Sequence, residues 1–87
     1  MTIEQDRADA LVRVRQEIDQ IDNDIIDLLM RRMVKARYAR YMHPGLDTDD
    51  VRQQQVVARY SKRLMPWVSS SEVHELCSAL FRMSRPS

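Results

Sequence analysis

Residues with special backbone or redox chemistry are scarce in this chain. Its 87 residues include one glycine, Gly45, and one cysteine, Cys77. A single glycine excludes the glycine-rich loops that cradle phosphates, and a single cysteine excludes a disulfide within the chain. Without a cluster of cysteine and histidine, a structural zinc site is not expected either. Because Cys77 lies in an apolar helical pattern, we predict a small buried thiol.

Long apolar runs and an excess of charge are also missing. No hydrophobic stretch approaches the roughly 18 residues of a membrane span. The N-terminal ten residues lack the charged and apolar regions of a secretory signal. The formal net charge is only +1, which gives the chain as a whole no attraction to nucleic acid or to an anionic membrane. We therefore expect a cytoplasmic protein in which any cationic chemistry is local.

The most prominent feature of the sequence is a long helical pattern. The stretch from Arg15 to His43 contains no glycine and no proline, and its apolar residues recur at intervals of three and four. That spacing keeps one side of an α-helix dry. The apolar series, called the seam below, comprises Leu11, Val14, Ile18, Ile21, Ile25 and Leu28. The seam is typical of a long helix that packs against another long helix.

The first predicted helix runs from about Gln5 to Met42. Thr2 and Gln5 have the form of a capping box, in which each residue satisfies a backbone N–H group near the other. Pro44 followed by Gly45 ends this helix, because the residue before a proline is pushed out of helical geometry.

Two shorter helices follow. Asp47 or Thr48 is the expected cap of the second helix, which Pro66 ends. Ser69 and Glu72 have the capping-box spacing that starts the third helix. The predicted fold class is therefore all-α, with one long helix and two short ones.

Eighty-seven residues make one domain, which we expect to span residues 1–87. No other segment is long enough to cover the first helix. Pairing two copies of that helix is the simplest way to bury its apolar side, so we predict an entwined homodimer.

Arginines stand where a packed helical body would prefer apolar groups. They are Arg15, Arg32 and Arg52. Each of them alone is compatible with a solvated surface position. Several arginines around one cavity favour a dianionic small molecule, because a guanidinium group binds carboxylates bidentately. Arg32 and His43 lie eleven residues apart on one helix side with Ala36 and Ala39 between them, which leaves room for a small anion.

Two motifs carry a resemblance to a known family. R-x-E-I-D-x-I-D-x-x-I-I-x-L-L-x-R-R-M starts at Arg15, and D-x-x-R-Q starts at Asp49. These motifs, and the seventeen residues from Arg15 to Arg32, resemble the all-helical chorismate mutases and their relatives the isochorismate pyruvate lyases. The resemblance covers nearly the whole chain. It implies an entwined dimer that rearranges chorismate to prephenate, in the shikimate pathway of aromatic amino acid biosynthesis, without a cofactor or metal.

The resemblance also implies a role for each matched residue. Arg15 would reach across the dimer to one substrate carboxylate, and Arg32 would bind the other. Asp49 and Arg52 match the acidic and basic positions of the second-helix motif. Ser84 matches a small polar residue of the last helix, which would bind the substrate.

Three positions depart from the family pattern. Where the family has a lysine or arginine for the ether oxygen of the substrate, the register gives His43, and Arg40 about one turn earlier is the alternative. Gln53 stands where many mutases have a glutamate, and its amide can still accept a hydrogen bond from the substrate hydroxyl. A glutamine that often supplies a second donor would fall just past Ser87. These departures concern catalytic efficiency more than fold.

Several functions are compatible with these residues. The first is a chorismate mutase, weak alone and activated by a larger enzyme partner. The second is an isochorismate pyruvate lyase, which R-R-M at residues 31–33 resembles, and the third is a non-catalytic regulatory dimer. Nucleic-acid binding would need a basic face, which the aspartates before Arg31 and the small net charge argue against.

Overall fold

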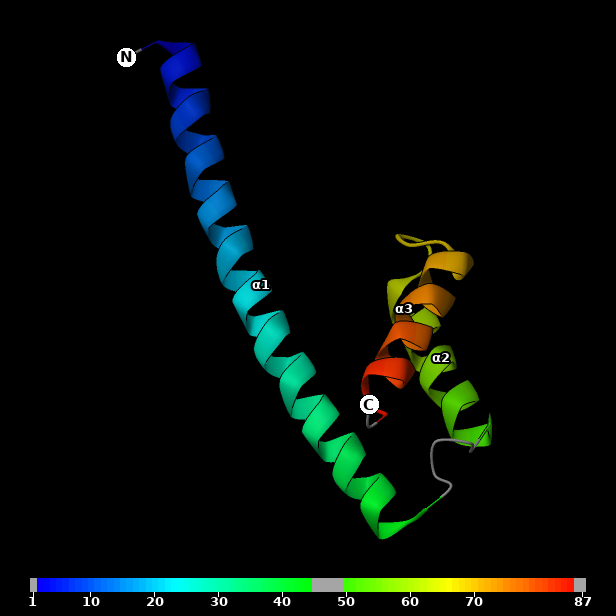
Figure 1. The fold of residues 1–87 in the computed structure, drawn as a ribbon. Coiled ribbons are helices and arrows are strands. Elements are labelled where there is room, and N and C mark those ends of the chain that lie inside the picture. Colours follow the sequence, from blue (N-terminus) through cyan, green and yellow to red (C-terminus); the bar gives the residue numbers. More distant parts are fainter. Residues whose placement is uncertain (1, 45–49, 86–87) are drawn as a thin grey trace. The chain divides into compact units, whose positions relative to one another are not determined.

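The computed structural model describes residues 2–44 and 50–85, which contain three α-helices and no strand (Figure 1). They are α1 (Ile3–Met42), α2 (Asp50–Leu64) and α3 (Ser70–Met83). The all-α fold class is therefore confirmed, with one long helix before two short ones. The expected turn at Gly45 and the expected caps Asp47 and Thr48 lie outside the described residues. No described helix combines the length and the apolar character needed to cross a membrane.

The start of α1 agrees in part with the predicted capping box. The Thr2 hydroxyl accepts a hydrogen bond of 3.1 Å from the Gln5 backbone N–H. The Gln5 side chain also bonds along the helix, because its amide nitrogen donates to the Asp9 carboxylate at 3.4 Å. At the other end, the His43 N–H donates to the Ala39 carbonyl at 2.9 Å, so helical hydrogen bonding continues up to the proline.

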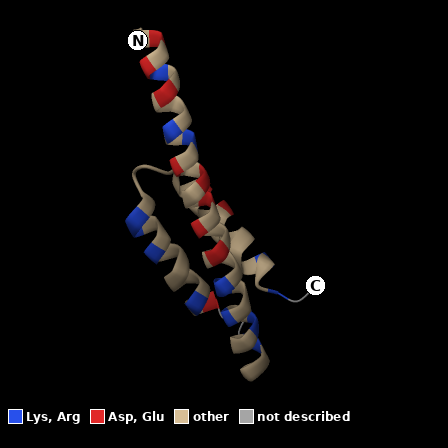
Figure 2. Ribbon diagram, turned by 90° about the vertical axis from the view of Figure 1, so that its left-hand side faces the viewer, with Lys and Arg blue, Asp and Glu red and all other residues tan. Residues whose placement is uncertain are grey.

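Charge is segregated along α1. The five acidic residues from Glu17 to Asp27 have no lysine or arginine among them. The five cations from Arg31 to Arg40 have no acidic residue among them. Figure 2 shows the acidic residues along the middle of α1 and the basic residues after them. Although the net charge of the chain is small, positive charge is concentrated on α1 between Arg31 and Arg40.

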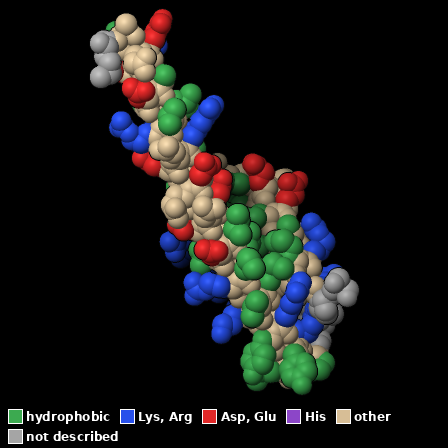
Figure 3. All heavy atoms as spheres, turned by 60° about the vertical axis from the view of Figure 1, so that its left-hand side comes forward, with side chains coloured by type: hydrophobic (Ala, Val, Ile, Leu, Met, Phe, Trp, Pro, Cys, Tyr) green, Lys and Arg blue, Asp and Glu red, His purple; other side chains and the backbone are tan. Residues whose placement is uncertain are grey.

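The chain divides into two compact units, Met1–Arg31 and Arg32–Ser87. The first unit is a length of α1, and no residue of α1 is buried. The seam residues are 47–57 % exposed. Figure 3 shows hydrophobic side chains uncovered on the face that it presents. This unit alone has nothing on which its apolar side can pack, which keeps the expectation of a partner helix in place.

The second unit contains the hydrophobic core. Its buried residues are Val56, Val73, Cys77 and Leu80, each with 0–4 % of its surface exposed. They join α2 to α3, which run antiparallel (Figure 1). The predicted burial of the Cys77 thiol is confirmed. Trp67, in the connection between α2 and α3, is 88 % exposed, so it takes no part in this core.

The start of α3 confirms the second predicted capping box. The Ser69 hydroxyl accepts from the Glu72 N–H at 3.1 Å, and the Glu72 carboxylate accepts from the Ser69 N–H at 3.2 Å. These two hydrogen bonds hold the pKa of Glu72 below its ordinary value, and the one that involves the Ser69 side chain has the larger effect. The cap sets the start of α3 and thereby the positions of its later residues.

Candidate anion-binding site

A cavity of about 320 Å³ lies within the second unit. Its lining residues are Arg32, Lys35, Ala36, Ala39 and Arg40 of α1, Arg52, Gln53 and Val56 of α2, Phe81 of α3, and Ser84 directly after α3. All three helices therefore contribute residues to the cavity lining. The volume lies at the lower end of the range for small-molecule pockets, which suits a compact ligand.

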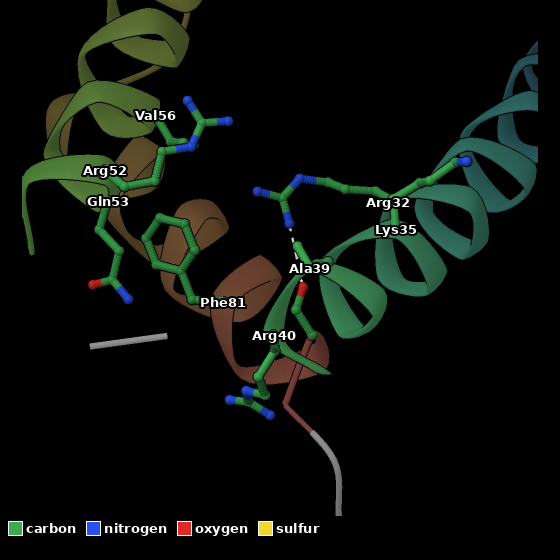
Figure 4. Close-up of a pocket in the computed structure, with 10 residues that line it drawn as sticks. Arg32, Lys35, Ala39, Arg40, Arg52, Gln53, Val56 and Phe81 are labelled. Carbon is green, nitrogen blue, oxygen red and sulfur yellow. Dashed lines mark hydrogen bonds between the residues drawn. The ribbon is translucent and has the colours of Figure 1, made fainter. Parts of the chain in front are cut away.

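The lining is cationic and apolar. Four of the ten lining residues are lysine or arginine, and none of the described lining residues is acidic. Figure 4 shows the guanidinium groups of Arg32 and Arg52 extending from opposite sides toward the space between their helices, with the Phe81 ring beside that space. Guanidinium groups bind carboxylates, and an aromatic side chain packs well against a flat apolar group of a ligand. The cavity therefore suits a small anion that contains a ring.

Arg32 is held by the end of α3. Its Nη1 atom donates to the Ser84 hydroxyl oxygen at 3.3 Å, and this hydroxyl donates to the Leu80 carbonyl oxygen at 2.7 Å. Arg32 and Ser84 are half-buried. One turn further along α1, the Arg37 Nη2 atom donates to the Met83 carbonyl oxygen at 3.2 Å. Two arginines of α1 thus bind two adjacent residues at the end of α3.

The positive charge of Arg32 also reaches the buried side of α3. Burial raises the pKa of the Cys77 thiol above its ordinary value, and the Arg32 charge opposes this rise with a smaller effect. Because the thiol is fully buried and its pKa is raised, it is neutral near pH 7 and is a structural group.

Arg40 and His43, which the sequence offers as alternatives, lie in different surroundings. Arg40 lines the cavity and is half-buried. His43 is exposed, does not belong to the described lining, and has its Nδ1 atom 3.3 Å from the Pro44 carbonyl oxygen. Of these two residues, only Arg40, which lies one turn earlier on the helix, belongs to the described cavity lining.

The other predicted site residues fall into three groups. Arg32, Arg52, Gln53 and Ser84 line the cavity, as Arg40 does. Arg15 lies in the first unit and is exposed. Asp49 lies outside the described residues.

Sequence reasoning missed three lining residues as members of the site. Val56 and Phe81 are apolar residues of α2 and α3, and apolar spacing in a sequence does not distinguish a core from a cavity floor. Lys35 is three residues after Arg32, a spacing that places both on one helix side. Figure 4 shows its amine directed away from the cavity, so its stem forms the wall.

Among the described residues, no group of three or more histidine, cysteine, aspartate or glutamate side chains could hold a metal ion. Comparisons of the chain with protein-family models, curated proteins and solved structures find no significant match. The choice of function therefore depends on the chemistry of the cavity and on the motifs in the sequence.

Proposed function

We propose that this chain is a chorismate mutase, which converts chorismate to prephenate by a [3,3] rearrangement. The observation that supports this most directly is a small cavity with four cations and no described acidic residue in its lining. Chorismate is a compact dicarboxylate with one ring, so its charge and shape fit such a cavity. The motif that starts at Arg15 supports the same assignment.

The rearrangement is unimolecular, so it needs neither a nucleophile nor a proton transfer. A protein accelerates it by holding the substrate in its compact reactive conformation and by placing positive charge where the breaking ether oxygen becomes negative. In the proposed site Arg32 and Arg52 bind the substrate carboxylate on their side. Arg40 meets the ether oxygen, with His43 as the alternative, and Gln53 accepts from the substrate hydroxyl.

We also propose that the active form is a homodimer paired along the seam. The support is the exposure of all six seam residues in the single chain, because pairing two such faces would remove that apolar surface from water. Arg15 lies among the seam residues, and in the dimer it would reach the cavity of the partner subunit. Each site would then bind the second substrate carboxylate through the other copy, and Asp49 would complete the substrate-binding set. A cytoplasmic location belongs to the same proposal and is tested by cell fractionation.

The deciding experiment supplies the purified protein with chorismate and, separately, with isochorismate. Formation of prephenate from chorismate supports the proposal. Formation of salicylate and pyruvate from isochorismate would assign the lyase activity instead, which the R-R-M sequence at residues 31–33 favours.

A chain that consumes neither substrate would be a regulatory or interaction dimer. Binding separates an active site from an inactive one, since a dicarboxylate transition-state mimic raises the unfolding temperature only where it binds. Repeating the turnover assay with a larger partner enzyme, once one is identified by co-purification, would test activation by docking.

A further inference from the structure

The hydrogen bonds of Ser84 define its role in the cavity. A serine hydroxyl has one hydrogen to donate and two lone pairs that accept, whereas a guanidinium group can only donate. Ser84 must therefore accept from Arg32, at 3.3 Å, and its one hydrogen points to the Leu80 carbonyl, at 2.7 Å. In this arrangement the Ser84 hydroxyl has no hydrogen left for a ligand carboxylate.

The last turn of α3 orients the Ser84 hydroxyl. The Leu80 carbonyl lies four residues earlier and also accepts from the Ser84 backbone N–H, at 3.2 Å. A hydroxyl that bonds back to the carbonyl one turn earlier has its side-chain rotamer set by the helix. Donating to that carbonyl also makes the hydroxyl oxygen a better acceptor, since linked hydrogen bonds polarise each other. The oxygen is thus a fixed and strengthened acceptor at the wall of the cavity.

A fixed acceptor matters for an arginine because the arginine side chain is long and flexible. It loses considerable rotamer freedom when it is ordered, and a ligand that has to order it binds less tightly. Arg32 has five N–H groups, and the hydrogen bond to Ser84 uses one of them. The guanidinium group that Figure 4 shows extending into the space beside Phe81 is therefore oriented before a ligand arrives.

We propose that Ser84 is a positioning residue, which as an acceptor holds the Arg32 guanidinium group toward the cavity and does not itself donate to the ligand. This deepens the proposed function and depends on it only for the identity of the ligand. It differs from the role that the family resemblance implies for Ser84, which is direct substrate binding.

The chain offers a matched control. Arg37 donates to the Met83 carbonyl, the residue next to Ser84, and therefore joins the same two helices. This second hydrogen bond is exposed, and Arg37 does not belong to the described cavity lining. Arg37→Gln removes a connection between α1 and the end of α3 without touching the site.

The first test measures the order of the Arg32 side chain by ¹⁵N NMR in the ligand-free protein, with the signal assigned by its loss in Arg32→Lys. We expect a rigid signal in the parent protein and in Arg37→Gln, and a mobile one in Ser84→Ala. Ser84→Thr keeps the hydroxyl and should restore rigidity. An Arg32 signal that is equally rigid in Ser84→Ala, or already mobile in the parent, would overturn the proposal. This readout needs no substrate, so it stands even if chorismate is not turned over.

The second test is a double-mutant cycle on the affinity for a dicarboxylate transition-state mimic, measured by calorimetry. Ser84→Ala should weaken binding about 10- to 100-fold, the range of a hydrogen bond to a charged group. In an Arg32→Ala background the same change should have almost no further effect, because Ser84 acts through Arg32. Additive losses would show that Ser84 contacts the ligand directly and would overturn the proposal. If the parent protein does not bind the mimic, the proposed function fails and the NMR result alone decides the role of Ser84.

Discussion

Truncating one seam residue tests whether two copies pair through that face. Ile21 is 55 % exposed in the single chain, so about half of its side chain remains to be buried by a partner. The change Ile21→Ala removes three carbons, worth about 0.8 kcal/mol each when fully buried. Half of that loss is about 1.2 kcal/mol per chain. A symmetric dimer loses it twice, so the dissociation constant should rise about 50-fold.

The matched control is Met30→Ala. Met30 is 60 % exposed, similar to Ile21, and lies nine residues further along α1. At 3.6 residues per turn it points to the opposite side of the helix, about 180° away. Both changes remove apolar side-chain atoms from exposed positions of the same helix. Only the first should weaken a dimer that pairs along the seam.

Sedimentation velocity over a dilution series measures the dissociation constant of the parent and of both variants. Circular dichroism on the same samples checks that the helix content is unchanged. The reasoning is refuted if the parent is a monomer at every concentration. It is also refuted if Ile21→Ala and Met30→Ala shift the constant equally, because the seam would then not be the contact.

Three further predictions concern the site and the start of α3. Arg40→Ala should lower the turnover number about 100-fold, as expected for a lost donor at a developing negative charge, while His43→Ala should have little effect. The opposite pattern, a large loss in His43→Ala and little change in Arg40→Ala, would instead assign the ether oxygen to His43. Arg15→Ala and Arg32→Ala should each nearly abolish turnover, and mixing the two variants should restore part of it, since one of the two sites in a hybrid dimer carries both arginines. Confirmed hybrids without activity would exclude a shared site. Ser69→Ala should raise the pKa of Glu72 toward its ordinary value and lower the unfolding temperature near pH 7. The Glu72 pKa is lowered in the folded chain, so its contribution is present above the unfolded pKa and is lost as the pH falls through the folded one. The difference between parent and variant should therefore shrink in acid, and a difference that is independent of pH would contradict the role of Glu72.

The fold was predictable because its signals are local. The period of three and four along α1 needs no knowledge of the rest of the chain, and the Ser69 and Glu72 cap involves residues three apart.

The site was predictable only in part because its contacts are distant in sequence. Arg32 and Ser84 are separated by 52 positions, and no local pattern states that one accepts from the other. Spacing along α1 correctly put Arg32 and the alanines on one side. It could not distinguish Arg40 from His43, because that choice depends on side-chain reach and on where the helix meets the proline. It also could not show that Phe81 borders a cavity, since a cavity floor and a packed core have the same apolar spacing.

One face of α1 links the proposed dimer to the proposed site. Ile21, Ile25 and Leu28 continue at the same three-and-four spacing into Arg32, Ala36 and Ala39. This face of α1 is apolar up to Leu28 and becomes cationic at Arg32, which is the first residue of α1 in the cavity lining. In the proposed dimer, a partner helix on the apolar part would lie along this same face of α1, and Arg15 of the partner subunit would come from that direction. In the proposed site, Arg32 and Arg52 of one chain bind one carboxylate, and a dicarboxylate needs a second anchor. Pairing along the seam would provide that anchor and would also bury the apolar face. We therefore expect the dimer to bind the dianion and the monomer not to bind it.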